Sequence, residues 1–111
     1  MIEKRAETAT FDLLIAGDYG RALEICERFC LDGFCVSVFR ADYVYTMGRE
    51  EGVCVRIINY PRFPSSEMEL EGKAKSLGLL LMEGLNQGSF SIVGPRETVF
   101  VSRRKKDGFD G

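Results

Sequence analysis

The order in which two apolar patterns alternate along the chain most constrains its fold. Residues 11–16 (FDLLIA) form a short apolar run that predicts a strand. Apolar residues then recur with the helical period of 3.6 over residues 22–30, which predicts a helix ending near residue 31. Residues 34–45 and 53–60 are rich in β-branched and aromatic residues on either side of a glycine-containing turn at 47–52. This second pattern predicts a β-hairpin.

The second half of the chain repeats this alternation. Ser66 and Glu69 have the S-x-x-E spacing of a capping box, so a helix is predicted from there to about residue 85. Segments 89–93 and 98–102 flank a Gly-Pro turn and predict a second hairpin. Three glycines lie inside the predicted helix at a spacing of six residues, and we interpret them as sites of close packing on a sheet: Gly72, Gly78 and Gly84.

The resulting order, β-α-β-β-α-β-β, predicts an α+β fold of the ferredoxin-like type with one added C-terminal strand. Two helices would cover one face of an antiparallel sheet with strand order 4-1-3-2, and the fifth strand would lie beside the fourth. A length of 111 residues is that of one domain. We assign residues 1–102 to this domain and residues 103–111 to a basic, disordered tail.

Composition indicates an ordinary globular protein rather than a strongly charged one. Apolar residues make up 45% of the chain and the formal net charge is -2, which is too small to attract nucleic acid by itself. The N-terminus lacks the apolar core of a signal peptide, and no apolar run is long enough to cross a bilayer. These features predict a cytoplasmic protein with reduced cysteines and no membrane partner.

No residue pattern predicts catalysis, a metal or a cofactor. The chain has no histidine, the commonest general base, so Ser-His and Cys-His pairs are excluded. The spacing of Cys26, Cys30, Cys35 and Cys54 does not match paired zinc knuckles, and core packing is the simpler interpretation. We therefore predict that the chain is not an enzyme. The remaining alternative is an enzyme using isolated groups: Asp18, Glu50, Glu51, Cys35 or Cys54.

Strand alternation predicts an apolar outer sheet face, turned away from the helices. It would carry Cys35, Ser37, Phe39, Cys54, Arg56, Ile58 and Tyr60, with either Phe100 or both Val99 and Val101 from the last strand. Exposed apolar surface of this kind marks interaction sites. The rigid loop 60–64 (YPRFP) adds aromatics around an arginine, a composition favoured at interfaces. The predicted partner-binding residues are Phe39, Arg56, Ile58, Tyr60, Arg62 and Phe63.

Two further segments are candidate binding sites. Gly17, Asp18, Tyr19 and Gly20 lead from a strand into a helix N-terminus, where backbone N–H groups can hold a ligand or anion. The simpler interpretation is that Asp18 caps the helix. The tail residues Arg103, Arg104, Lys105 and Lys106 could contact nucleic acid, although the aromatic pattern of RNA-binding sheets is absent and such a partner is not favoured.

These observations favour a small non-catalytic interaction protein over the alternatives. It would act as an adaptor or as an inhibitor of a larger protein or complex, like the small proteins with which phages and other mobile elements block host enzymes. It would bind a protein partner, or a second copy of itself, through the outer sheet face and loop 60–64. The alternatives are a dimeric small-ligand sensor and a weak nucleic-acid binder acting through the tail.

Overall fold

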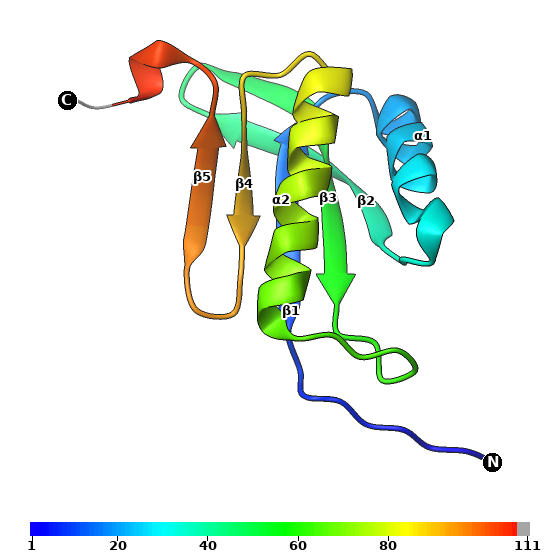
Figure 1. Ribbon diagram of the computed structural model, residues 1–111. Helices are drawn as coiled ribbons and strands as arrows, with labels where there is room; N and C mark the ends of the chain where they lie inside the picture. Colours follow the sequence, from blue (N-terminus) through cyan, green and yellow to red (C-terminus); the bar gives the residue numbers. More distant parts are fainter. Residues whose placement is uncertain (109–111) are drawn as a thin grey trace.

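A computed structural model describes residues 1–108 of the chain (Figure 1). The strands are β1 (Thr10–Ala16), β2 (Ser37–Tyr45), β3 (Gly48–Ile58), β4 (Ser89–Val93) and β5 (Thr98–Ser102). The helices are α1 (Tyr19–Phe29) and α2 (Glu67–Gly84), with the 3-10 turns η1 (Cys30–Asp32) and η2 (Lys105–Asp107). Within the described residues, no helix is long and apolar enough to cross a membrane.

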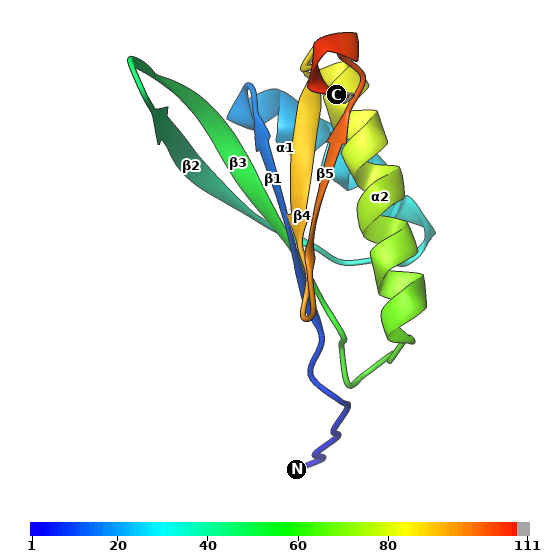
Figure 2. The same cartoon turned by 90° about the vertical axis from the view of Figure 1, so that its left-hand side faces the viewer.

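The strands form one antiparallel sheet in the order β2-β3-β1-β4-β5. This order confirms the predicted α+β topology, including the place of the fifth strand beside the fourth. Both helices lie on the same side of the sheet, as Figures 1 and 2 show together. The sheet therefore has a helix-covered face and a second face that no other element of the described chain covers.

The core lies between the sheet and the helices. Val53, Val55 and Ile57 alternate along β3 with outward-facing residues, and all three are fully buried. Leu77 and Leu81 of α2 are also fully buried, one helical turn apart. Alternation thus assigned Val53, Val55 and Ile57 to the core face correctly, whereas Ile58 and Tyr60, which it placed on the outer face, lie beside α2.

The first hairpin is longer than predicted, which corrects the turn expected at 47–52. Pairing of β2 with β3 continues to Tyr45 and Gly48, so only Thr46 and Met47 form the turn. Met47 has a φ of 72° and is almost fully exposed. Cross-strand backbone pairing does not require apolar side chains, and it therefore extends through the polar residues 49–51. The hairpin tip projects beyond the rest of the sheet (Figure 2).

The three glycines of α2 differ in their surroundings. A Cβ at Gly78 would lie 2.3 Å from the Phe90 ring, and one at Gly84 would lie 2.4 Å from the end of Ile25. Close packing explains these two positions, as predicted, although Gly84 packs against α1 rather than the sheet. A Cβ at Gly72 would meet nothing within 4 Å. Packing within the chain therefore does not explain Gly72.

Residues 103–108 of the predicted tail form a compact turn beside β4. Arg104 lies 2.8 Å from an oxygen of Asp107 and donates to the Ser89 hydroxyl at 3.0 Å. Lys105 and Lys106 are exposed on this turn. The last part of the predicted tail, residues 109–111, lies outside the described residues.

Candidate active site

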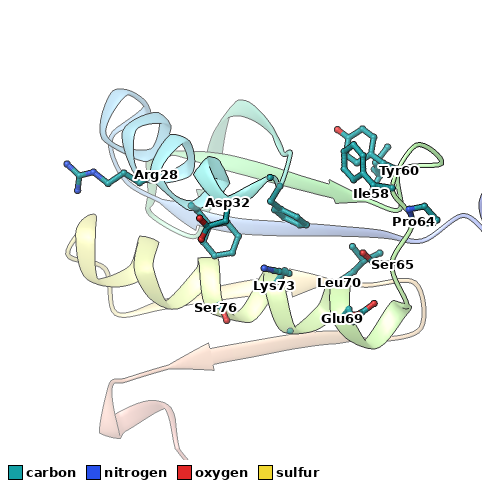
Figure 3. A pocket seen from close by; sticks show the side chains of 15 residues that line it. Arg28, Asp32, Ile58, Tyr60, Pro64, Ser65, Glu69, Leu70, Lys73 and Ser76 are labelled. Atoms are coloured by element: carbon teal, nitrogen blue, oxygen red, sulfur yellow. The ribbon is translucent and has the colours of Figure 1, made fainter.

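An open cleft of about 780 Å³ lies between α2 and the end of β3 (Figure 3). Its walls come from the N-terminal half of α2, the loop after β3, and the segment joining α1 to β2. This volume lies within the usual range for pockets that hold small molecules. The cleft is therefore the strongest candidate for a ligand site in the described chain.

One face of α2 forms the floor of the cleft. Glu69, Gly72, Lys73 and Ser76 all line it, and their i, i+3, i+4, i+7 spacing places them on one side of a helix. The helix begins at the predicted capping box, in which Glu69 accepts from the Ser66 N–H at 2.8 Å and the Ser66 hydroxyl accepts from the Glu69 N–H at 3.1 Å. These hydrogen bonds lower the pKa of Glu69 below its usual value, so the cleft contains a carboxylate at neutral pH.

Two phenylalanines form an aromatic wall facing Lys73. The rings of Phe29 and Phe34 meet edge to face, with their centroids 5.7 Å apart. Lys73 Nζ lies 5.8 Å from the Phe29 centroid and 5.5 Å from the Phe34 centroid. Both distances are within the range of cation–π attraction. This part of the cleft can accept a cation or a flat apolar ring.

A second aromatic pair lies at the Glu69 end of the cleft. Tyr60 and Phe63 stack with centroids 5.3 Å apart, and the Cys35 thiol donates to the Tyr60 hydroxyl at 3.1 Å. This hydrogen bond and partial burial raise the pKa of Tyr60, so its ring stays neutral at pH 7. Asn59 fixes the loop, because its side chain accepts from the Ser65 N–H at 2.9 Å and donates to the Glu7 carbonyl at 2.8 Å.

The sequence-predicted binding residues divide between two places. Ile58, Tyr60 and Phe63 line the cleft, and Arg62 is exposed on the same loop. Phe39 and Arg56 lie instead on the outer sheet face. The structure therefore does not bring the six residues together into one surface.

The outer sheet face combines an ion pair with exposed aromatics. Arg56 donates to both carboxylate oxygens of Asp12, at 2.8 and 3.1 Å, and lies 5.5 Å from the Phe39 centroid. The pairing of Ser91 with Phe100 resolves the register of β5 and places Phe100 on this face. Phe39 is 46% exposed and Phe100 56% exposed. Binding of a partner here stays a prediction.

The segment 17–20 lies at the other end of β3 from the cleft. Asp18 accepts the Arg21 N–H at 2.8 Å, and the Gly17 N–H donates to the Glu51 carbonyl at 2.9 Å. Arg40 lies 4.0 Å from the Tyr19 ring centroid. Helix capping, the simpler interpretation, is therefore confirmed for Asp18. Anion binding at this segment stays a prediction, as does nucleic-acid contact by residues 103–106.

Burial holds three of the four cysteines in the thiol form, because it raises the pKa of Cys26, Cys30 and Cys54. The pKa of Cys26, which packs in the core, is raised to about 12. Within residues 1–108, no three His, Cys, Asp or Glu side chains come close enough to hold a metal ion. The charged groups that line the cleft are two carboxylates, Asp32 and Glu69, and two cations, Arg28 and Lys73, beside the two aromatic pairs.

Most of the residues that form the cleft carry no functional signal in the sequence. Glu69 was noticed only as a helix cap, and Phe29 and Phe34 only as apolar residues of a helix and a strand. Lys73 carries no signal of its own. The available signal was the spacing of Glu69, Gly72, Lys73 and Ser76, a polar helix face that includes an unexplained glycine.

Two solved structures share this fold over nearly the whole chain. A phage SAM lyase in complex with S-methyl-5′-thioadenosine has 17% sequence identity and a TM-score of 0.68, covering 92% of this chain and 95% of that chain. A phage SAM lyase in the apo state has 16% identity and a TM-score of 0.66, covering 94% and 97%. Identity at this level establishes a shared fold. No protein-family model and no curated protein matches the sequence.

These neighbours contradict the prediction of a non-catalytic adaptor or inhibitor. Both are lyases, and the alignments cover 95% and 97% of their chains. The prediction was wrong because it treated the lack of histidine and of a nucleophile–base pair as evidence against catalysis. The role of a non-catalytic adaptor or inhibitor is withdrawn.

Proposed function

We propose that this protein is an enzyme that cleaves S-adenosylmethionine (SAM) into S-methyl-5′-thioadenosine and homoserine lactone. The observation that carries the proposal is the pairing of the ionised Glu69 with two aromatic pairs in one cleft of suitable volume. SAM carries a sulfonium, an ammonium group and a flat purine, and these three groups favour a carboxylate and aromatic faces. The shared fold of the phage SAM lyases supports the same assignment.

The reaction needs no group from the protein to break or form a bond. A carboxylate oxygen of SAM attacks its own γ-carbon, the bond between that carbon and sulfur breaks, and the electron pair moves to sulfur. The sulfonium becomes a neutral thioether, and the four-carbon fragment closes into a lactone that keeps its protonated amine. Because no proton is transferred and no water enters, a chain without histidine can catalyse this step by positioning alone.

The Glu69 end of the cleft has two roles in this reaction. Glu69 holds the α-ammonium group through a charge-assisted hydrogen bond, which leaves the substrate carboxylate free to fold toward the γ-carbon. The rings of Tyr60 and Phe63 lie beside the sulfonium and exclude water from it. The positive charge on sulfur disappears in the reaction, and an aromatic, poorly hydrated environment favours that loss. The four free cysteines fit a cytoplasmic location, where SAM is used.

The products test this proposal directly. We expect the purified protein to convert SAM into S-methyl-5′-thioadenosine and homoserine lactone, identified by NMR at early times. In H₂¹⁸O, any homoserine formed later by lactone opening would carry the label in its carboxyl group. Label in the γ-hydroxyl would indicate hydrolysis instead, and vinylglycine would indicate proton abstraction. Absence of any SAM cleavage by folded protein would refute the proposed function.

A plot of kcat/KM against pH should show no rise or fall caused by the titration of a general base. We expect kcat/KM to stay constant between about pH 5 and pH 8, since no group of the protein gains or loses a proton in the step. Activity should fall only under more acidic conditions, because the Ser66 hydrogen bonds keep the pKa of Glu69 below its ordinary value of 4.5. The stabilising effect of these bonds is likewise lost as pH falls through that lowered pKa.

Steady-state rates measured alongside circular dichroism at each pH would separate loss of the Glu69 charge from unfolding. A decline centred between pH 6 and pH 7 in folded protein would mean that a different group titrates during turnover.

A further inference from the structure

Lys73 and Glu69 are opposite charges on the cleft floor that do not pair with each other. Lys73 follows Glu69 by one helical turn, in the order of glutamate and lysine that favours an ion pair on a helix. The ion pairs formed within residues 1–108 nevertheless include neither residue. Both side chains therefore face the cleft with their charges available to a ligand.

Two aromatic rings hold the Lys73 side chain instead of a carboxylate. Its ammonium nitrogen lies 5.8 Å from the Phe29 centroid and 5.5 Å from the Phe34 centroid. These distances are near the outer limit of cation–π attraction. An ammonium group has three N–H donors, and an aromatic face satisfies none of them as fully as a carboxylate does. The rings thus fix the position of the charge and leave it able to bind an anion.

The two charges are close enough to influence each other across the cleft. The positive charge of Lys73 contributes to the lowered pKa of Glu69, after the larger effect of the Ser66 hydrogen bonds. Arg28 and Asp32, the other charged residues of the cleft, come from α1 and η1 on the opposite wall. Figure 3 shows Lys73 between Glu69 and Asp32, with Arg28 at the far end. Lys73 is therefore the cation that can share one small ligand with Glu69.

An α-amino acid has the matching pair of charges, because its ammonium and carboxylate groups are attached to the same carbon atom. We propose that Lys73 binds the α-carboxylate of SAM while Glu69 binds its α-ammonium group. This inference rests on the proposed function and adds a second binding residue for the amino-acid end of the substrate. A carboxylate has two oxygens, so Lys73 holds one of them and the other remains free to attack the γ-carbon.

The contact with Lys73 should contribute to KM rather than to kcat. The carboxylate loses its negative charge as it becomes the lactone ester, so its attraction to Lys73 is strongest before the reaction begins. For Lys73→Met we expect KM for SAM to rise about tenfold, as for a charge-assisted contact in a site open to solvent. The value of kcat should not fall, because the transition state loses less stabilisation than the bound substrate. Steady-state rates over a range of SAM concentrations would measure both constants.

Two ligands that are not cleaved separate the amino-acid end from the nucleoside. S-adenosylhomocysteine has the same amino-acid end as SAM, whereas S-methyl-5′-thioadenosine has none. Calorimetric titration of Lys73→Met should give a Kd about tenfold higher for S-adenosylhomocysteine and an unchanged Kd for S-methyl-5′-thioadenosine. Methionine keeps an unbranched side chain of similar length against the two rings, so the fold should be retained. Lys75→Met removes the same charge from an exposed position of α2 outside the cleft, and it should bind both ligands normally.

The proposed contact and the proposed function fail in different ways. If the original protein cleaves SAM and Lys73→Met binds S-adenosylhomocysteine as tightly as the original does, the contact is refuted and the function stands. Equal weakening of both ligands in Lys73→Met would also refute the contact, as would weakened binding by Lys75→Met. If the original protein binds S-adenosylhomocysteine through Lys73 but cleaves no SAM, the function alone is refuted. Neither cleavage of SAM nor binding of S-adenosylhomocysteine would refute both.

Discussion

Replacing Glu69 by glutamine is expected to lower kcat/KM for SAM about 100-fold, the effect of losing a charge-assisted hydrogen bond to the substrate ammonium group. Glutamine also serves at the third position of a capping box, so the contact with Ser66 and the start of α2 should be retained. The melting temperature should consequently change little. Initial rates of S-methyl-5′-thioadenosine formation, measured with thermal melts, would give both quantities.

Glu71→Gln is the matched control for this variant. Glu71 lies two residues further along α2 and lines a small depression near the β4–β5 turn instead of the cleft. The same loss of one negative charge there should leave kcat/KM nearly unchanged. A comparable loss in both variants would mean that overall charge, rather than a contact at Glu69, controls the rate. Full activity of Glu69→Gln would remove this residue from the proposed site.

Replacing Leu77 by alanine is expected to lower the free energy of unfolding by about 3 kcal/mol, as for other fully buried leucines. Leu77 lies on the sheet-facing side of α2, and no part of it is exposed to solvent. Its shortening leaves a cavity that the closely packed sheet and helix cannot fill. For a domain of this size, the melting temperature should fall by roughly 12 °C. Urea titration followed by circular dichroism would measure the loss.

Leu79→Ala, two residues away on the same helix, is the natural comparison. Leu79 is 51% exposed, so its shortening should cost less than about 1 kcal/mol. The contrast tests the rotation of α2, which also determines whether Glu69, Gly72 and Lys73 face the cleft. Equal losses from the two leucines would mean that α2 packs through a different face, and the assignment of the cleft floor would then fail.

Local patterns predicted most of the fold. The change of period from two to 3.6 along the chain identified every strand and both main helices, and Ser66 with Glu69 marked the start of α2. The error in the first hairpin arose because residues 49–51 are polar. Their backbone pairs with β2 all the same, and only the pairing partner reveals this. Strand propensity is a property of one segment, whereas the length of a strand in a sheet also depends on the strand with which it pairs.

The cleft could not be predicted in the same way. Phe34 and Lys73 are far apart in the sequence, and each has an ordinary local interpretation as core residue or solvated charge. They lie close together because the segment before β2, the loop after β3 and α2 all line the same cleft. The chemistry also misled the sequence analysis, since a substrate that carries its own nucleophile and leaving group requires no conspicuous residue from the enzyme.

The sequence by itself determined the α+β class, the order of the elements and the face that each strand turns to the core, because these depend on periodicity and on short-range capping. Only the tertiary structure decided which polar residues share a cleft. It placed Glu69 beside the aromatic loop 60–64, and it separated Gly72 from the two glycines that serve packing. The physical reason is that periodicity reports burial along one element, whereas a binding site depends on distances between elements that no local pattern contains.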